Sequence, residues 1–219
     1  MQKSINGYDR RRFIKTTTTL TAAGFAFFPQ TACGRDSADD NINIIGPKKG
    51  FSPQVGTLVS MMDWMRLVVL RSVRSLTTAQ LDYLHDSKSN SIGAMLLHLA
   101  ATERYYQLHT FEGKKWGTWD EAEKKRWNVP MGLGEAARNE IRGNGLDYYL
   151  NRLQEVREHT IQELKKRDDK WLLAVDKEWS WGPTNNYCKW FHVCEHESNH
   201  NGQIKWIKSR LPGSGSSGE

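Results

Sequence analysis

Apolar and polar positions along residues 55–211 recur with the period of a helix, and almost no stretch alternates as a strand does. The apolar side chains recur at spacings of three and four, which places them on one helical face, in four segments at residues 55–74, 91–111, 146–168 and 184–211. Asn90 or Ser91 is the expected N-cap of the second segment, and Thr184 or Asn185 that of the fourth. Four long amphipathic helices are therefore predicted.

The connections between these segments decide how the helices are arranged. Residues 112–145 contain Pro130 and several glycines, and they predict a long crossover with a short helix around Asp120–Trp127. Four helices with one long crossover are typical of a bundle. The predicted fold class is all-α, a four-helix bundle with the crossover between its second and third helices.

The N-terminal segment differs in composition from the helical region. Arg10 and Arg11 precede an apolar, Thr-rich stretch at Thr16–Phe28, an arrangement that resembles a twin-arginine export signal. Such a segment is removed or becomes an anchor, so residues 1–33 are excluded from the fold. Cys33 ends a sequence that resembles a lipobox, although a polar residue stands where an aliphatic one is usual. We expect a protein that is exported by the twin-arginine route and is either periplasmic or anchored by a lipid at Cys33. Simple cleavage and an uncut leader are the alternatives to the lipid.

The remaining boundaries follow from length and composition. A chain of 219 residues is expected to hold one domain with appendages. Residues 34–54 are polar with scattered Gly and Pro and predict a flexible linker, and residues 212–219 predict a flexible Gly/Ser tail. Residues 55–211 are the predicted bundle. No apolar run is long enough for an ordinary transmembrane helix.

The net charge of +6 could indicate a nucleic-acid partner, so the distribution of basic residues along the chain must be considered. Residues 1–32 carry five basic residues and one acidic residue, so the rest of the chain, with 26 basic and 24 acidic residues, is nearly neutral. A nearly neutral domain has no basic surface for a phosphate backbone. The charge therefore belongs to the leader, and nucleic acid is excluded as a partner.

The three cysteines carry no metal or disulfide signature. Cys33, Cys188 and Cys194 are too few and too unevenly spaced for a disulfide framework or a Cys-rich metal site. Cys188 and Cys194 would point to different faces of one helix, so they cannot bridge. Both are predicted to be buried free thiols.

Three histidines on two predicted helices suggest a metal site. His196 and His200 are four residues apart, so they lie on one helical face, one turn apart, where two imidazoles can share an ion. His98 lies in the most apolar predicted helix and is the candidate third ligand, because a lone imidazole there would otherwise be buried without a partner. Three neutral imidazoles leave a coordination position open, as catalytic sites do. We expect one divalent transition metal per chain, Zn²⁺ first, with Ni²⁺ or Fe²⁺ as alternatives.

Two stretches carry a family resemblance. Ser91–Tyr106, which includes His98, resembles the second helix of DinB-like proteins, and His196–Ile204 resembles their fourth-helix signature. The resemblance implies an up-down-down-up four-helix bundle, a divalent metal on His98, His196 and His200, and frequent homodimers. Many members have Arg after the last ligand, where this chain has Asn201, so no substrate-binding role of that Arg is expected here. Several relatives look like thiol S-transferases or isomerases that use the metal to bind a thiolate.

The expected function is a metal-dependent enzyme acting on a small molecule, a thiol S-transferase or a hydrolase. Glu197 would act as base or support a ligand, and Gln203 would orient the substrate. Export argues against thiol transfer, because low-molecular-weight thiols are mainly cytosolic. The main alternative is a non-catalytic exported metal-binding or scaffold protein. A minor alternative is a zinc protease, because His196-Glu197-x-x-His200 is also the helix motif of that class.

Overall fold

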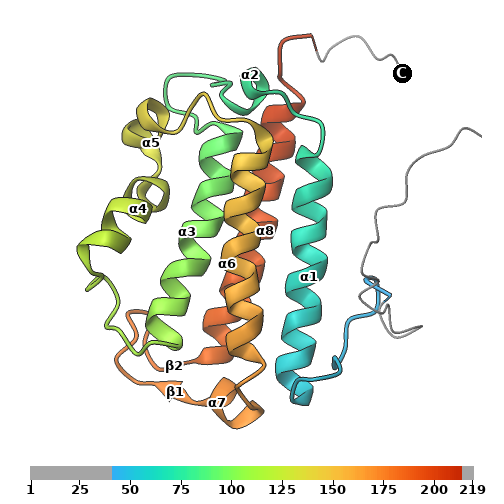
Figure 1. Cartoon of the computed structure of the whole chain (residues 1–219), viewed down its shortest axis with the longest axis vertical. Coiled ribbons are helices and arrows are strands. Elements are labelled where there is room, and N and C mark those ends of the chain that lie inside the picture. The colour runs from blue at the N-terminus through green and yellow to red at the C-terminus, as the bar shows by residue number, and fades with distance from the viewer. Residues whose placement is uncertain (1–40, 214–219) are drawn as a thin grey trace, which may run out of the picture. The chain divides into compact units, whose positions relative to one another are not determined.

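The computed structural model describes residues 41–213, and four long helices in it form a bundle (Figure 1). The bundle helices are α1 (Pro53–Val73), α3 (Ile92–Thr110), α6 (Leu146–Leu164) and α8 (Asn186–Lys208). The shorter elements are α2 (Thr78–Leu81), α4 (Glu121–Gly132), α5 (Gly134–Glu140), α7 (Asp169–Leu173), β1 (Val175–Asp176) and β2 (Thr184–Asn185). The export signal, Cys33 and most of the predicted tail lie outside the described residues. The all-α fold class is confirmed.

The helix directions follow from the lengths of the connections. Figure 1 shows α1 running up, α3 and α6 running down and α8 running up, which is the up-down-down-up order. Because α3 and α6 run in the same direction, the chain between them must return to the top of the bundle, and α4 and α5 lie on this return path, with α4 packed on α3. α3 packs against α6 and α8, and α8 also packs against α1. This order places α3 and α8 side by side.

The ends of the long helices are set by caps that the sequence predicts. The Ser91 side chain accepts a hydrogen bond from the backbone N–H of Ala94, and the Asn185 side chain accepts one from Cys188. Each cap satisfies a backbone N–H that has no partner within its helix. Pro53 stands in the first turn of α1, where its missing N–H costs no helical bond. α6 and α8 end earlier than expected, at Leu164 and Lys208.

The crossover contains more helix than expected. The helix predicted around residues 120–127 continues to Gly132, and a second helix, α5, follows it. Pro130 does not end α4 because it lies close to the end of the helix, where few backbone bonds remain to be lost. Leu133, with φ of 51°, separates the two helices. The predicted end of this helix near residue 127 is therefore wrong, because neither Pro130 nor the glycines break the helices of the crossover.

The core consists of two apolar clusters that meet at a layer of charged residues. The first lies toward the α2 end and includes Val69, Leu96 and Ile204, and the second lies toward the β1–β2 end and includes Leu58 and Trp190. On α1, α6 and α8, one buried charged residue stands between the members of the two clusters: Arg66, Arg157 and Glu197. The bundle core is therefore divided by polar contacts.

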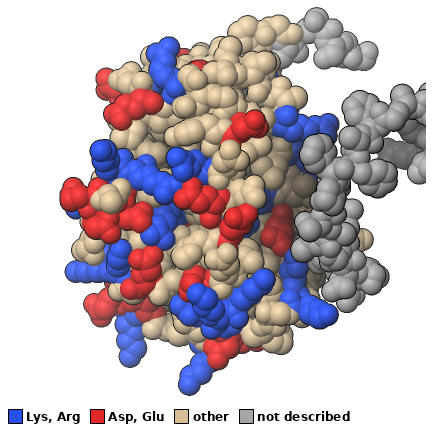
Figure 2. All heavy atoms as spheres, in the orientation of Figure 1, with Lys and Arg blue, Asp and Glu red and all other residues tan. Residues whose placement is uncertain are grey.

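The described part of the predicted linker contacts the bundle. Lys48 forms an ion pair with Asp63 of α1 (2.7 Å), and the backbone N–H of Gly46 donates to the Ser60 hydroxyl. Figure 2 shows Lys and Arg interspersed with Asp and Glu on the visible face of the bundle, without a continuous basic surface there. Within residues 41–213, no helix is long and apolar enough to cross a membrane.

Candidate metal centre

The seam between α3 and α8 brings the three predicted histidine ligands together. His196 and His200 lie one turn apart on α8, and His98 faces them from α3. The Nε2 atom of His196 is 3.2 Å from Nε2 of His98 and 3.2 Å from Nε2 of His200. Within residues 41–213 the three form the one group of three or more His, Cys, Asp or Glu side chains that could hold a metal ion, and their potential ligand atoms all lie within 4.8 Å of one another. The structure therefore assembles the predicted triad from residues that are a hundred positions apart in sequence.

A backbone carbonyl in the crossover orients His98. The ring Nδ1 lies 3.0 Å from the carbonyl oxygen of Pro130. That oxygen belongs to the last turn of α4, where carbonyls have no partner within the helix. A carbonyl can only accept, so Nδ1 must carry the proton and Nε2 must carry the lone pair. Metal-binding histidines in proteins are usually held this way through their other ring nitrogen.

Gln203 gives His200 the same kind of support. The His200 Nδ1 lies 3.2 Å from Oε1 of Gln203, and Nε2 of Gln203 donates to Oδ1 of Asn199 at 3.1 Å. With its Nδ1 donating to the amide oxygen, His200 also turns an unprotonated Nε2 toward His196. Gln203, predicted to orient the substrate, thus contacts a candidate ligand directly.

Burial keeps the triad in the neutral form that binds metals. His98 and His200 are each 8% exposed. Burial, with the neighbouring imidazoles adding to it, lowers the pKa of His98 to about 4 and that of His196 to about 3. Burial also lowers the pKa of His200. At neutral pH the lone pairs are therefore available, and a proton on His196 Nε2 could satisfy only one of its two neighbours at a time.

This donor set fits a divalent transition metal. Nitrogen donors at neutral pH suit Zn²⁺, Ni²⁺ and Fe²⁺, whereas Ca²⁺ and Mg²⁺ prefer oxygen. The lone pairs of His98 and His200 both point at Nε2 of His196, which can donate to only one of them, so an unpaired lone pair remains unless a cation lies among them. Three protein ligands also leave a position for a substrate atom.

His192, one turn before His196 on α8, is not part of the triad. Its Nδ1 lies 2.9 Å from the Tyr106 hydroxyl, and its ring centroid lies 5.4 Å from that of His196 and 5.0 Å from that of Trp181. Burial lowers the pKa of His192 as well. His192 therefore joins the triad to an aromatic surface toward the β1–β2 end.

Glu197, the predicted base, points into the core rather than into the triad. It is 1% exposed, and its Oε1 accepts hydrogen bonds from Arg66 (2.6 Å) and Arg157 (2.8 Å). Both arginines also bind Glu103, at 2.9 Å from Arg66 and 2.8 Å from Arg157. The four residues, one from each bundle helix, form the buried ion cluster. Glu197 has no hydrogen bond to the three histidines, and its role as a base stays a prediction.

The buried ion cluster is internally balanced. It holds two positive and two negative groups, and the backbone carbonyls of Leu153 and Met62 accept from Nη1 of Arg66 and of Arg157, respectively. Burial alone would raise the pKa of Glu103, but Arg157 and Arg66 lower it overall. Burial alone would likewise lower the pKa of Arg157, but Glu103 and Glu197 raise it overall. The cluster fixes α8, and with it the backbone that carries His196 and His200.

Arg66, Glu103 and Arg157 were missed in the sequence. Each stands beside apolar positions of a helix, as Arg66 does between Met65 and Val69, and that position was the available signal. A charged residue on an apolar face could be recognised, but its partners on three other helices could not.

The remaining histidines and cysteines lie elsewhere. His85 contacts the Trp206 ring, and His109 accepts from the buried Lys189 ammonium at 2.8 Å. Cys194 is buried as predicted, but Cys188 is exposed, so the prediction for Cys188 is wrong. It lies about 200° around α8 from buried Trp190, on the side that faces solvent.

Comparison with known families agrees with this geometry. The family model described as Mycothiol-S-transferase matches residues 57–213, which contain all four bundle helices except the first turn of α1 and all three histidines. Comparison with curated proteins gives no match. The resemblance to DinB-like proteins is confirmed, since the matched family is DinB-like. The chain belongs to the mycothiol S-transferase family.

Proposed function

We propose that the protein is a metal-dependent thiol S-transferase that joins a low-molecular-weight thiol of the mycothiol class to an electrophilic small molecule. The observation that carries this proposal is the convergence of three neutral imidazoles, two of which, His98 and His200, are oriented by Pro130 and Gln203. The family match supports sulfur transfer over the hydrolytic alternative.

Separate residues would bind the metal ion and support its ligands. His98, His196 and His200 would hold the ion, with Zn²⁺ as the first candidate and Ni²⁺ or Fe²⁺ as alternatives. When bound, a divalent ion lowers the pKa of a thiol and holds its sulfur as a thiolate. Gln203 keeps the His200 lone pair aimed at the ion, and the buried ion cluster keeps α8 in place.

The transfer is a substitution at the electrophilic carbon. The thiol loses its proton to solvent, its sulfur forms a bond to the electrophilic carbon, and the leaving group departs with the bonding electrons. A thiolate is a far stronger nucleophile than a thiol, so the chemistry needs a group that keeps sulfur ionised at neutral pH. A base on the protein is not required, which suits the placement of Glu197 among arginines.

The reaction is tested with purified protein loaded with Zn²⁺. We expect formation of the thioether from mycothiol and chlorodinitrobenzene, followed by absorbance, above the rate without protein. The His196→Ala variant is the control, since two ligands hold an ion poorly. Zinc bound at the triad without turnover of any thiol or ester would favour the non-catalytic metal-binding alternative.

Glu197 also separates this proposal from the zinc-protease alternative. In that class the glutamate after the first histidine activates water, which requires a carboxylate beside the metal. Here Oε1 of Glu197 is occupied by Arg66 and Arg157 in the core. This arrangement favours transfer to a small molecule over peptide hydrolysis.

Export and dimer formation remain separate proposals supported by the sequence. Because low-molecular-weight thiols are mainly cytosolic, export argues against thiol transfer, and the family match favours thiol transfer. The pair Arg10–Arg11 before an apolar stretch supports the twin-arginine route, and Cys33 supports a lipid anchor. Changing both arginines to Lys should leave the precursor in the cytoplasm, and Cys33→Ala should release the protein from the membrane fraction. Sedimentation equilibrium tests the homodimer that the family resemblance implies.

A further inference from the structure

A cavity of about 520 Å³ lies in the α3–α8 seam, between the triad and the α2 end of the bundle. This volume is typical of pockets for small organic ligands. Residues of α8 and of the loop before α3 line it, among them Lys88, Asn90, Asn199, Gly202, Gln203 and Trp206. We name it the amide cavity, after its three carboxamide side chains.

The amide cavity adjoins the candidate metal centre. Gln203 lines the cavity and contacts the His200 Nδ1 at 3.2 Å. Asn199 lies three residues after His196, on the same stripe of α8, and Met95 lies three residues before His98 on α3. A molecule that fills the cavity can therefore extend one of its atoms toward the triad.

The polar groups of the cavity are mainly donors. The amide oxygen of Asn90 accepts from the backbone N–H of Gly134, and that of Asn199 accepts from Gln203. The NH₂ groups of Asn90 and Asn199 and the ammonium group of Lys88 are thus the atoms left for a ligand. No carboxylate stands among the lining residues. Such a cavity suits a ligand with many oxygen acceptors, hydroxyl, carbonyl or carboxylate.

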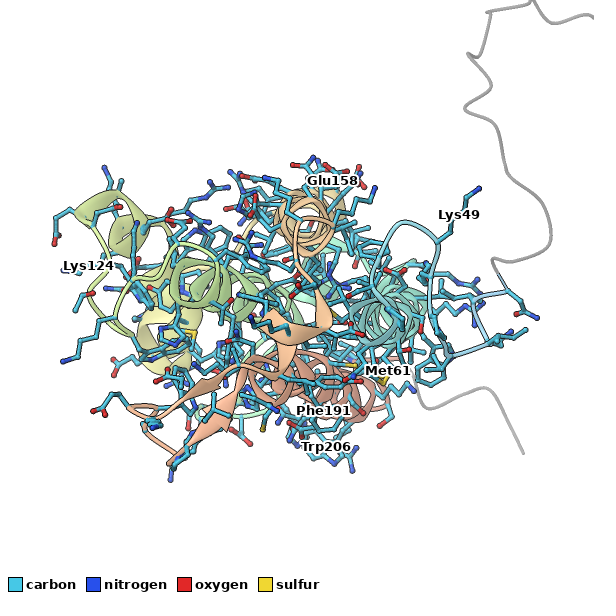
Figure 3. All side chains as sticks on the ribbon, turned by 90° about the horizontal axis from the view of Figure 1, so that it is seen from below. Lys49, Met61, Lys124, Glu158, Phe191 and Trp206 are labelled. Atoms are coloured by element: carbon cyan, nitrogen blue, oxygen red, sulfur yellow. The ribbon has the colours of Figure 1, made fainter. Side chains whose placement is uncertain are left out.

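We propose that the amide cavity binds the oxygen-rich body of the thiol substrate and places its sulfur at the triad. The inference rests on the proposed S-transferase function and adds the place where that function selects its thiol. The Trp206 ring at the outer rim, 46% exposed and projecting from α8 (Figure 3), would border the bound molecule.

Gly202 allows a sharp test because a side chain there would enter the cavity without striking the protein. A Cβ built at Gly202 meets no atom within 4 Å, and Gly202 lines the cavity within a helix. Leu and Ala are both better helix formers than Gly, so neither variant should unfold α8. Gly202→Leu fills the cavity, and Gly202→Ala is the matched control for the backbone change.

The experiment compares a large thiol with a small one on zinc-loaded protein. For mycothiol, Gly202→Leu should lower kcat/KM by more than about tenfold while Gly202→Ala stays near wild type. For mercaptoethanol, which has no body to place, all three proteins should have similar rates. Zinc content should stay the same throughout. Equal loss with both thiols, or no loss with either, would overturn the cavity assignment.

A binding measurement separates this inference from the proposed function. Calorimetry with S-methyl mycothiol, which cannot react, should show binding to wild type and Gly202→Ala but not to Gly202→Leu. If no thiol is turned over yet this pattern holds, the S-transferase proposal fails and the cavity assignment stands. If turnover occurs and S-methyl mycothiol binds all three alike, the cavity assignment is wrong.

Two variants of Lys88 show whether the ligand presents carboxylate or hydroxyl oxygens to the amide cavity. A carboxylate ligand should bind more weakly to Lys88→Gln and still more weakly to Lys88→Glu, because the positive partner is removed and then reversed. A neutral hydroxyl body should show a change of less than about threefold in Kd with Lys88→Gln. Glutathione and mycothiol, compared in the same assay, provide the two ligand types. Unchanged binding of both ligands to Lys88→Glu would contradict a role for Lys88 in the cavity.

Discussion

The triad and the buried ion cluster share a helix, and their contributions alternate along it. His196 is followed by Glu197, and the two side chains leave α8 about 100° apart, one toward the α3 seam and one into the core. Both clusters bury polar groups in an apolar bundle, which costs free energy unless the groups are satisfied. They meet this cost in different ways.

The ion cluster pairs its charges within the protein, although Oε2 of Glu197 is buried without a hydrogen-bond partner. Each guanidinium has carboxylate and carbonyl acceptors, and Glu103 also accepts from the Thr160 hydroxyl at 2.6 Å. In the triad, by contrast, Nδ1 of His98 and of His200 each has a hydrogen-bond partner, while the three Nε2 atoms face one another. A polar cluster whose charges balance within the protein has a structural role, whereas one that is balanced only with a ligand marks a site.

Loss of a triad ligand should have the largest effect of the changes considered. His98→Ala should reduce S-transferase activity by more than about 100-fold, since even removal of a residue that supports a metal ligand costs 10–100-fold in metal affinity. The measurement is the initial rate at a fixed, subsaturating zinc concentration. The fold should survive, because the core does not depend on His98, and circular dichroism checks this.

Substitutions in the buried ion cluster should lower the stability of the fold more than they lower the catalytic rate. Glu103→Gln and Glu197→Gln should each lower the free energy of unfolding by about 3–5 kcal/mol, because each leaves buried guanidinium groups without a full partner. For a domain of this size, that corresponds to a fall in Tm of roughly 6–20 °C.

Glu103→Gln is also the matched control for the predicted base. Both variants disturb the same cluster, but only Glu197 adjoins a candidate ligand in sequence. At a temperature where both are folded, equal activities would place Glu197 in the structural role. A much larger loss of activity in Glu197→Gln alone would support a base.

Acid should destabilise the metal-free protein through the triad. The folded pKa values of His98 and His196 lie below the unfolded value of 6.5, so the unfolded state binds protons first as the pH falls. The free energy of unfolding should therefore be highest above pH 6.5 and decrease toward pH 4. A contribution of roughly 3 kcal/mol from each of the two histidines is expected over that window. Denaturant unfolding of wild type and of a His98→Gln, His196→Gln double variant measures it, and equal slopes with pH would contradict the account.

The support given by Gln203 should have the smallest effect. Gln203→Leu removes the acceptor of His200 and should weaken zinc affinity by about 10–100-fold. Gln203→Glu keeps an acceptor at the same position and should retain tight binding. Competition with a zinc-binding dye measures both, and similar affinities in Gln203→Leu and wild type would remove Gln203 from the metal centre.

The parts of the account that were predictable from sequence are those carried by local spacing. Helix periodicity identified the four bundle helices, cap residues located two of their starts, and the i, i+4 spacing joined His196 to His200. His98 was found because an imidazole in an apolar helix needs a partner.

Contacts between residues far apart in the chain could not be predicted from the sequence. Nothing near His98 indicates that the carbonyl of Pro130 would orient it, because that contact depends on how the crossover folds back. The same holds for Arg66, which meets Glu197 from another helix, 131 positions away. Spacing along one helix is visible in a sequence, and contacts between helices depend on the packing.

Elemental analysis of protein purified without chelators shows whether His98, His196 and His200 together hold one divalent metal ion. We expect about one transition-metal ion per chain in wild type and in His192→Ala, and close to none in His200→Ala. A full metal content in His200→Ala with an empty site in His192→Ala would shift the ligand set by one helical turn. Wild-type protein that stays metal-free after incubation with excess Zn²⁺ would contradict the metal centre itself.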